Sequence, residues 1–303
     1  MQAFTRFSTR SRALLFAGIA LIALAILAAG SYLRCARADE PEPFVFVVMG
    51  DSRPNSPSQA QPGVYRDILK EIDALNPAFV VHTGDLIYGS ADIETVRRQY
   101  KDFQEVTRLL LRARVYITIG NHEIQGKKAN QEFFEKELGD LYYSFDHQGS
   151  HFIVLNSDTV GREARITGEQ LEWLKQDLRK ARAARHKFVF AHKPLYPVDG
   201  HMGKCLDKYP EERDALHQLF TRNRIDTVFT GHEHLFDEHT KNGVRYIITG
   251  GGGAFLYPSI YGTGDFYHYI VVSVLGDKVE LKVVRPARNG RPSQVIPVGK
   301  TAR

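Results

Sequence analysis

Short apolar runs that stop at a polar residue recur along this chain. Open α/β sheets place their ligand chemistry at the carboxyl ends of such strands. We therefore expect the polar residues to share one rim, where nitrogen and oxygen donors suit a polynuclear metal site bridged by Asp85. The predicted strands and the residues that follow them are 44–49 with Asp51, 79–82 with Asp85, 115–119 with Asn121, 187–191 with His192, and 227–230 with His232.

The segments between these runs carry apolar residues at helical spacing. We predict helices at residues 64–75, 93–114, 131–137 and 211–222, and another that begins at Thr167, where Gln170 completes a capping box. Paired strands follow, predicted as hairpins over 142–155, 236–249 and 267–284. Together these elements predict an α/β fold, a four-layer α-β-β-α sandwich with two mixed β-sheets in one domain.

The beginning of the chain departs from this pattern. Ala13 to Leu33 contains no charged residue and follows Arg6, Arg10 and Arg12. This pattern predicts one N-terminal transmembrane or signal helix, with the body exported. We favour an inner-membrane anchor whose body faces the periplasm or another extracytoplasmic space. The alternative is a signal peptide cleaved after Ala38, which would release a secreted protein.

The predicted organisation is therefore an anchor or signal peptide at 1–38, a linker at 39–43, a folded domain at 44–285 and a basic C-terminal tail at 286–303. The chain has 40 Lys and Arg against 35 Asp and Glu, but residues 1–38 hold five Arg and no acid. The remainder is thus balanced, so no nucleic-acid partner is expected. The arginines of the tail are read as a frayed solvated end rather than as a phosphate or anionic-lipid contact.

Five short motifs carry a family resemblance. In their order, and each after a predicted strand, they resemble the five blocks of the calcineurin-like metallophosphoesterase superfamily, over residues 44–284. The motifs are Gly50-Asp51, Gly84-Asp85, Gly120-Asn121-His122-Glu123, His192 and Gly231-His232-Glu233-His234. The resemblance implies that residues 44–285 form a metallophosphoesterase domain.

The resemblance also implies a set of metal ligands and a reaction. It implies one ion held by Asp51, Asp85 and His234, and a second ion held by Asp85 together with Asn121, His192 and His232. A hydroxide between two such ions attacks phosphorus in line, so no protein nucleophile is required. His122 would then contact the phosphoryl group or donate a proton to the leaving oxygen.

One position departs from the family pattern. The first block is commonly D-x-H, and its His binds a metal, but here the residue is Arg53, which stays protonated and cannot be a ligand. Tyr88 matches the G-D-x-x-Y pattern of the purple acid phosphatase branch, in which a Tyr phenolate binds ferric iron. The alternative is a first site closed by water or another residue. Arg53 is interpreted as a catalytic contact to the substrate phosphate, with pairing to a carboxylate as the alternative.

The expected protein is a dinuclear-metal phosphatase acting on small-molecule monoesters. A phosphodiesterase with a nucleotide or lipid-linked substrate and a non-catalytic metal- or phosphate-binding module remain alternatives. With Tyr88 as a ligand the ions would be Fe with Zn or Mn, and otherwise Mn, Zn or Fe(II) pairs. The membrane is an expected partner through the N-terminal helix, and the sequence makes no prediction of oligomeric state.

Several neighbouring residues receive plainer expectations. His82 is expected to be a hydrogen-bonded core residue, and Glu123 and Glu233 to be spacers, with Glu123 fixing a loop. His201 faces either the substrate or solvent. Residues 250–253 are expected to form a tight turn that passes near the site rather than a phosphate cradle.

Overall fold

The computed structural model describes residues 41–198, 200–257 and 265–297. The predicted transmembrane or signal helix within residues 1–38 lies outside these ranges. Among the helices of the described ranges, none has the length and apolar character that crossing a membrane requires.

Two sheets of six strands each form the centre of the described body. The first has the order β12-β11-β10-β1-β2-β3 and the second β4-β5-β6-β7-β9-β8. Both are mixed, since β1, β2 and β3 run parallel, as do β5, β6, β7 and β9, while the remaining neighbours are antiparallel. The strands are β1 (Phe44–Met49), β2 (Phe79–His82), β3 (Val115–Ile117), β4 (Tyr143–His147), β5 (Ser150–Val154), β6 (His186–Phe190), β7 (Thr227–Thr230), β8 (Phe236–Lys241), β9 (Val244–Thr249), β10 (Tyr269–Leu275), β11 (Lys278–Arg285) and β12 (Gln294–Ile296).

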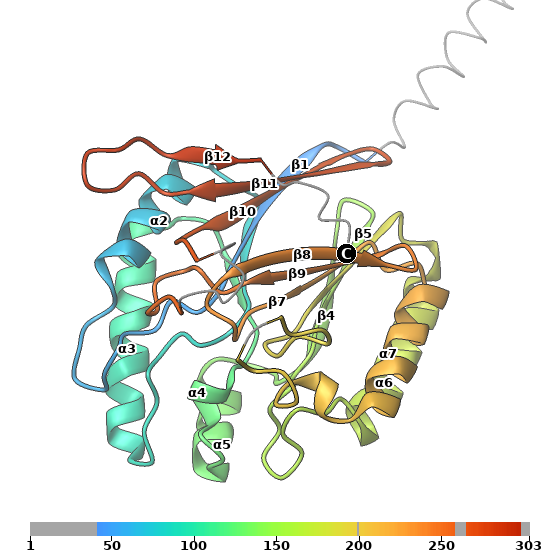
Figure 1. Ribbon diagram of the computed structural model, residues 1–303, viewed down its shortest axis with the longest axis horizontal. Coiled ribbons are helices and arrows are strands. Elements are labelled where there is room, and N and C mark those ends of the chain that lie inside the picture. Colours follow the sequence, from blue (N-terminus) through green and yellow to red (C-terminus); the bar gives the residue numbers. More distant parts are fainter. Residues whose placement is uncertain (1–40, 199, 258–264, 298–303) are drawn as a thin grey trace, which may run out of the picture. The chain divides into compact units, whose positions relative to one another are not determined.

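Helices cover the outer faces of both sheets. The pair α2 and α3 lies on one side of the stacked sheets, and the pair α6 and α7 on the other (Figure 1). The short helices α4 and α5 lie near one end of the sheets. The helices are α2 (Gly63–Leu75), α3 (Ile93–Leu110), α4 (Asn121–Ile124), α5 (Lys128–Glu137), α6 (Gly168–Lys180) and α7 (Pro210–Arg222), with single 3₁₀ turns at Ala181–Ala183 and Leu206–Lys208.

Three buried clusters show why the layers stack in this order. In β1, Val47 and Met49 face the cluster under α2 and α3, whereas Phe46 and Val48 face the cluster between the sheets. This division follows from the strand period of two, which sends alternate side chains to opposite faces. A third cluster joins the second sheet to α6 and α7. The predicted α-β-β-α sandwich with two mixed sheets is therefore confirmed for the described residues.

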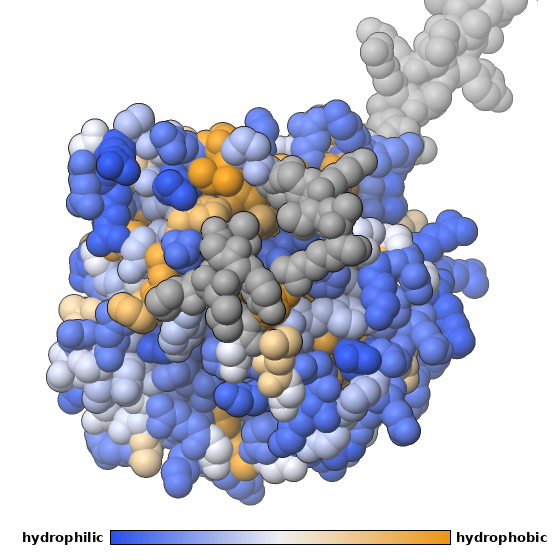
Figure 2. Space-filling model, in the orientation of Figure 1, coloured by the Kyte–Doolittle hydropathy of each residue, from blue (hydrophilic) through white to orange (hydrophobic). Residues whose placement is uncertain are grey.

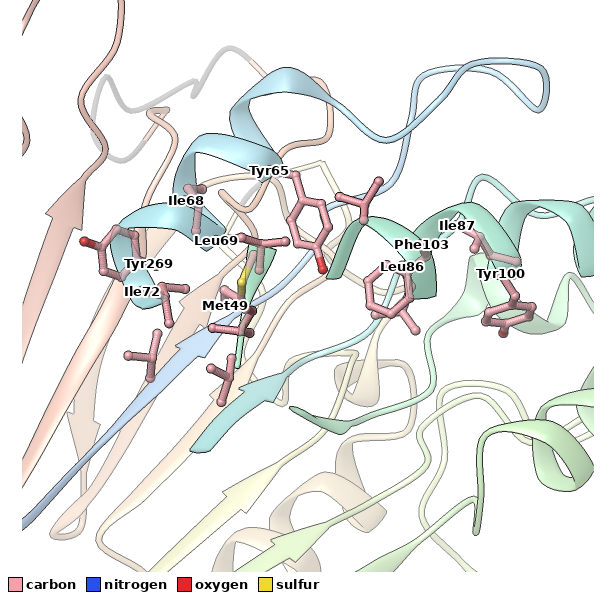
Figure 3. Packing of buried hydrophobic residues seen from close by; sticks show 14 of the residues in the cluster. Met49, Tyr65, Ile68, Leu69, Ile72, Leu86, Ile87, Tyr100, Phe103 and Tyr269 are labelled. Atoms are coloured by element: carbon pink, nitrogen blue, oxygen red, sulfur yellow. The ribbon is translucent and has the colours of Figure 1, made fainter. Parts of the chain in front are cut away.

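The cluster under α2 and α3 also anchors the loop after β2. Leu86 and Ile87 are fully buried there, directly after Asp85. Figure 3 shows them beside Phe103 and Tyr100 of α3, with Tyr65 of α2 nearby. The apolar core thus holds the backbone on the carboxyl side of Asp85.

Two element boundaries differ from the sequence predictions. The helix predicted over 93–114 ends at Leu110, because Leu111 is extended and the Arg112 side chain and backbone N–H donate to Asp73 instead. The strand predicted over 115–119 ends at Ile117.

The predicted capping box at Thr167 is wrong. The Thr167 side chain makes no cap hydrogen bond. Gln170 instead uses its side chain to bond the backbone of Asn156, accepting from the N–H at 2.7 Å and donating to the carbonyl at 2.8 Å. The buried N–H and C=O of Asn156 need hydrogen-bond partners, and the Gln170 side chain supplies them instead of capping the helix.

The expectation of a frayed C-terminal end is wrong for part of residues 286–303. Gln294–Ile296 forms β12 and pairs with β11, so Val283 lies opposite Ile296 and Arg285 opposite Gln294. The first sheet therefore extends beyond residue 285.

One buried histidine joins β4, β5 and α6. His151 of β5 lies 2.6 Å from Asp146 through Nδ1 and 2.8 Å from Asp177 through Nε2, and Asp177 also accepts from the Ser144 hydroxyl. Burial alone would lower the pKa of His151, but the hydrogen bonds and charges of Asp177 and Asp146 outweigh it and raise the pKa above its usual value. The pair of carboxylates therefore favours the imidazolium form.

We expect His151→Gln to destabilise the fold by about 1–3 kcal/mol at pH 6, because a charge-assisted contact is lost. Since the pKa is raised on folding, the stabilisation is full below the pKa of the unfolded chain and falls as pH rises through the folded pKa. The gap in unfolding free energy between wild type and variant, measured by urea titration, should therefore shrink from pH 6 towards pH 9.

Asp177→Asn and Asp146→Asn serve as a matched pair for this test. The Asp177 side chain is 11% exposed and that of Asp146 78% exposed, so the first substitution should cost more. Equal costs, or a gap that does not depend on pH, would contradict the assigned network.

Candidate metal centre

The polar residues that follow the parallel strands meet at one rim, as the sequence predicts. Asp51 follows β1, Asp85 follows β2 and Asn121 begins α4 after β3, so the first sheet contributes three of them. His192 follows β6 of the second sheet, and His232 and His234 follow β7. The contacts between these residues join positions as far apart in sequence as Asp51 and His232, whose backbone N–H donates to the Asp51 carboxylate.

Asp51 is surrounded by the loop after β7. Its carboxylate accepts from the His232 backbone N–H at 3.0 and 3.1 Å, and lies 3.5 Å from His234 Nε2. Gly231 makes this approach possible, because a Cβ there would lie 2.3 Å from Asp51 Oδ2. The backbone of Asp51, Asp85 and His232 has positive φ angles of 57°, 57° and 71°. Non-glycine residues rarely adopt this conformation, and it is concentrated at functional sites.

Asp85, which follows a strand of the first sheet, contacts a polar residue that follows a strand of the second sheet. Its Oδ1 lies 3.2 Å from His192 Nε2 and accepts from the His122 backbone N–H at 3.1 Å. His192 Nε2 lies 3.0 Å from Asn121 Oδ1 and 3.2 Å from His232 Nδ1. The side-chain donors predicted for the second ion are therefore linked by direct contacts.

The donor atoms suit a cation. His192 Nδ1 donates to the Thr83 carbonyl at 2.9 Å, so Nε2 is the nitrogen that faces the oxygens of Asp85 and Asn121 and that a cation would engage. In the same way, His234 Nδ1 donates to the Phe255 carbonyl at 2.5 Å and leaves Nε2 towards Asp51. Backbone carbonyls commonly orient metal-binding histidines in this manner.

The ligands predicted for the first ion also form a compact group. One ligand atom each of Asp51, Asp85 and His234 lies within 4.8 Å of the others, and all three residues are buried. Buried lone pairs that face one another are unfavourable unless a proton or a cation lies between them. The residues present therefore fit the ligand sets that the family resemblance implies.

Burial and nearby charges set the protonation states of Asp85 and His232. Burial would raise the pKa of Asp85, but His192, His122 and Arg53 hold it well below its usual value. Burial, together with His192, lowers the pKa of His232 well below its usual value. Asp85 thus stays an anion, and His232 a neutral base, which are the forms that bind metal.

Glu123 organises the loops around the centre. Its buried carboxylate accepts from the backbone N–H groups of Asp85 at 2.9 Å, Leu86 at 2.8 Å, Ile87 at 3.2 Å and Gly120 at 2.7 Å. Burial, and then the nearby Asp85, raises the pKa of Glu123 to about 7. The expectation that Glu123 fixes a loop is correct. Its description as a spacer missed these four backbone contacts, which no sequence pattern indicates.

Arg53 pairs with the central carboxylate. Its Nε lies 3.5 Å from Asp85 Oδ2, and its side chain is 10% exposed. Among the described residues this Nε has no hydrogen-bond acceptor. Pairing with a carboxylate, the alternative interpretation of Arg53, is what the structure records. The predicted contact to a substrate phosphate remains a prediction.

Tyr88 and His122 lie side by side at the edge of the centre. Their ring centroids are 5.6 Å apart, and the Arg53 guanidinium lies 5.8 Å from the Tyr88 ring. His122 Nδ1 donates to the Tyr88 carbonyl at 2.5 Å, and its Nε2 lies 3.9 Å from Asp85 Oδ2. Tyr88 as a metal ligand remains a prediction.

The structure also shows where the residues next to the predicted ligands lie. His82 is a hydrogen-bonded core residue, as predicted, with Nε2 3.0 Å from the Ser52 hydroxyl, and burial lowers its pKa to about 3. The His201 ring lies 4.5 Å from that of His232, so this loop residue faces the centre. Gly252 passes close to the first block, where a Cβ would lie 2.3 Å from the Gly50 carbonyl, which agrees with the prediction that this segment passes near the site.

Comparisons with known proteins agree with this geometry. The family model described as calcineurin-like phosphoesterase matches residues 44–236. The chain is 28% identical over 205 residues to the bovine serine/threonine-protein phosphatase CPPED1, covering 64% of this chain and 66% of that protein. It is 30% identical over 196 residues to purple acid phosphatase 21 of Arabidopsis thaliana, covering 56% of this chain and 42% of that protein.

A solved structure shares the fold. The purple acid phosphatase PPD1 from yellow lupin superposes with a TM-score of 0.64 at 17% identity, covering 82% of this chain and 52% of that one. The chain thus spans less than two thirds of the length of these relatives.

We expect Glu123→Gln to lower the affinity for metal ions about ten- to hundredfold, because the amide NH₂ cannot accept the N–H groups that the carboxylate holds. Metal content after equilibration at limiting metal, measured by mass spectrometry, is the readout. Glu163→Gln is the matched control, since the Glu163 carboxylate accepts from the Gly161 N–H in an exposed loop. Equal metal content in the two variants would contradict the role given to Glu123.

Proposed function

We propose that this chain, which belongs to the calcineurin-like phosphoesterase family, is a phosphatase that hydrolyses phosphate monoesters with two metal ions. Members of this family hydrolyse phosphate esters, and relatives of the chain carry the name phosphatase. The carrying observation is that two donor groups, one with Asp51 and His234 and one with Asn121 and His192, both include Asp85.

Asp51, Asp85 and His234 would hold one ion, and Asp85, Asn121, His192 and His232 the other. When bound, a pair of ions supplies an activated water at neutral pH and neutralises charge on the phosphoryl group. The protein residues contribute fixed positions, because each donor follows a strand end or is oriented by a backbone carbonyl.

In this proposal, His122 protonates the leaving oxygen. The Tyr88 carbonyl can only accept, so the proton on Nδ1 is retained, and Nε2 is the nitrogen that exchanges protons with a substrate. Nε2 lies 3.9 Å from Asp85 Oδ2, and the side chain is 22% exposed, so it reaches both the centre and solvent. A proton donated there turns the leaving alkoxide into an alcohol.

A cavity beside His122 suits the leaving group. It has a volume of about 310 Å³ and is lined by Asn121, His122, Ile124, Gln125, Gly126, Asp158, Glu163 and Lys193. Its position next to the proton donor and the ligand Asn121 supports a small-molecule phosphate ester as substrate. Arg53, beside Asp85, would add positive charge near the phosphoryl oxygens.

The identity of the ions depends on Tyr88. With a Tyr88 phenolate the centre would hold Fe(III) with Zn or Mn, and without it a Mn, Zn or Fe(II) pair. An iron-loaded sample with a visible charge-transfer band that disappears in Tyr88→Phe would support the first assignment, and a colourless sample would contradict it.

We also propose that the domain works outside the cytoplasm, either anchored by the helix predicted within residues 1–38 or released from it. The support is the charge-free Ala13–Leu33 after three arginines. Fusion of a reporter that is active only after export to the C-terminus would test this, and an inactive reporter in an expressed fusion would contradict it.

Hydrolysis of matched aryl phosphate mono- and diesters tests the function. The full-length protein, supplied with Mn or with Fe and Zn, should favour the monoester, and Asp85→Asn should lose turnover because both ions lose a ligand. A preference for the diester would move the assignment to the phosphodiesterase alternative. No turnover on either substrate despite two bound ions would favour the binding module.

Replacing the proposed proton donor tests the mechanism. We expect His122→Asn to lower kcat on an alkyl monoester about 10²–10⁴-fold while metal content is unchanged. The loss should be smaller for an aryl ester such as 4-nitrophenyl phosphate, whose leaving group needs little protonation. Equal losses on the two esters would indicate a positioning role instead.

A further inference from the structure

A second cavity lies away from the proposed metal centre. It has a volume of about 570 Å³ and lies where the connection between β11 and β12 meets the chain before β10. The surface over this connection is strongly hydrophilic (Figure 2, upper left). The lining contains none of the proposed metal ligands, but it includes three arginines, Arg285, Arg288 and Arg291.

Two of the three arginines lie over aromatic rings. The Arg285 guanidinium lies 4.8 Å from the centre of the Phe266 ring, and that of Arg288 lies 4.9 Å from the Tyr267 ring. Stacking of this kind leaves the N–H donors of the guanidinium edge available to a ligand. The side-chain amides of Asn289 and Gln294 add neutral donors to the same lining.

The tight turn between β11 and β12 brings two of the charges together. Arg288 and Arg291 exchange both backbone hydrogen bonds, each at 3.0 Å, around Asn289 and Gly290, whose φ angles of 52° and 75° are those of a type I′ turn. Residues paired in this way project their side chains to the same face of the hairpin, where like charges repel. This arrangement costs stability unless an anion compensates it.

No carboxylate supplies that compensation among the described residues. Within the described ranges, no ion pair joins any of the three arginines to an acid, although Asp265 also lines the cavity. Glu71 of α2 lies at the base of the hairpin, but its two oxygens accept from the Ala287 N–H at 2.6 Å and the Tyr269 hydroxyl at 3.0 Å. Beyond residue 284 the sequence contains no Asp or Glu at all.

We propose that this arginine cavity is a binding site for a multiply charged phosphate anion, separate from the metal centre. Guanidinium groups bind phosphate oxygens in pairs, and three of them suit a ligand with more than one phosphate or a phosphorylated headgroup. Leu256 also lines the cavity, and its neighbour Tyr257 stacks on the ring of His234 at 4.6 Å. A ligand there therefore contacts the segment that borders the metal centre.

Direct binding to full-length protein tests the site. All proteins carry Asp85→Asn and are kept in chelator, so that neither turnover nor metal-bound phosphate contributes. Isothermal titration with sodium tripolyphosphate should show binding that Arg288→Gln with Arg291→Gln weakens at least about tenfold. The matched control replaces Arg97 and Arg114, which lie 4.8 and 4.5 Å over the rings of Phe133 and Tyr116, by Gln, with the same loss of charge. The control should retain the affinity within about twofold.

Two outcomes would overturn the proposal. One is equal affinity for tripolyphosphate in the Asp85→Asn protein, in its Arg288 and Arg291 double variant and in its Arg97 and Arg114 control. The other is a large fall in the thermal midpoint of the Arg288 and Arg291 double variant without ligand, which would make the arginines structural. The proposal expects the opposite, an unchanged or higher midpoint, because repulsion between like charges is removed. Since binding is measured without turnover, failure here and failure of the proposed phosphatase activity are distinguishable.

A second ligand identifies the source of the anion. A soluble short-chain phosphatidylinositol phosphate is titrated under the same conditions as tripolyphosphate. Tighter binding of the lipid, lost in the Arg288 and Arg291 double variant, assigns the site to a membrane headgroup. Tighter binding of tripolyphosphate assigns it to a soluble polyanion.

Discussion

A buried carboxylate needs compensating positive charge, and the arrangement around Asp85 follows from that requirement. Asp85 is 2% exposed and lies within 3.2 to 3.9 Å of nitrogens from Arg53, His122 and His192. Arg53 and His122 follow strands of the same sheet as Asp85, and His192 follows a strand of the other sheet, so the full compensation forms only when the two sheets are stacked. Asp51 and His234 face each other on one side of Asp85, and His192 and Asn121 on the other, so the donor groups fit cations.

Around this centre the protein supports its functional groups with main-chain contacts. Glu123 holds four N–H groups of two loops, and carbonyls of Thr83, Tyr88 and Phe255 orient three histidines. The three carbonyl contacts each hold Nδ1, so that Nε2 is the ring nitrogen that faces the centre in all three histidines. Leu86 and Ile87 then tie the Asp85 loop into the apolar core.

The arginine cavity shows the same physical logic with the opposite sign. At the centre, clustered oxygen and nitrogen donors fit a cation, whereas at the hairpin after β11 the proposed anion would compensate neighbouring guanidinium groups. In both places a rigid backbone holds similar groups close together. At the centre this backbone includes residues with positive φ after strands, and at the hairpin it is a type I′ turn. The segment of Leu256 and Tyr257 borders both.

The sequence by itself determined the layers and most of the centre. Hydrophobic periodicity is a local property, so strands such as Thr227–Thr230 and the hairpin over 236–249 were predictable. Parallel strands present their carboxyl ends at one edge, so the convergence at one rim of the residues that follow them was predictable too. These residues are Asp51, Asp85, Asn121, His192, His232 and His234. Only the tertiary structure decided what each polar side chain contacts. Gln170 left its predicted cap for the Asn156 backbone, Glu123 gathered N–H groups from two loops, Arg53 paired with Asp85, and Gln294–Ile296 joined a sheet instead of fraying. These partners lie far apart in the chain, and a buried polar group bonds to whichever partner the packing brings within reach.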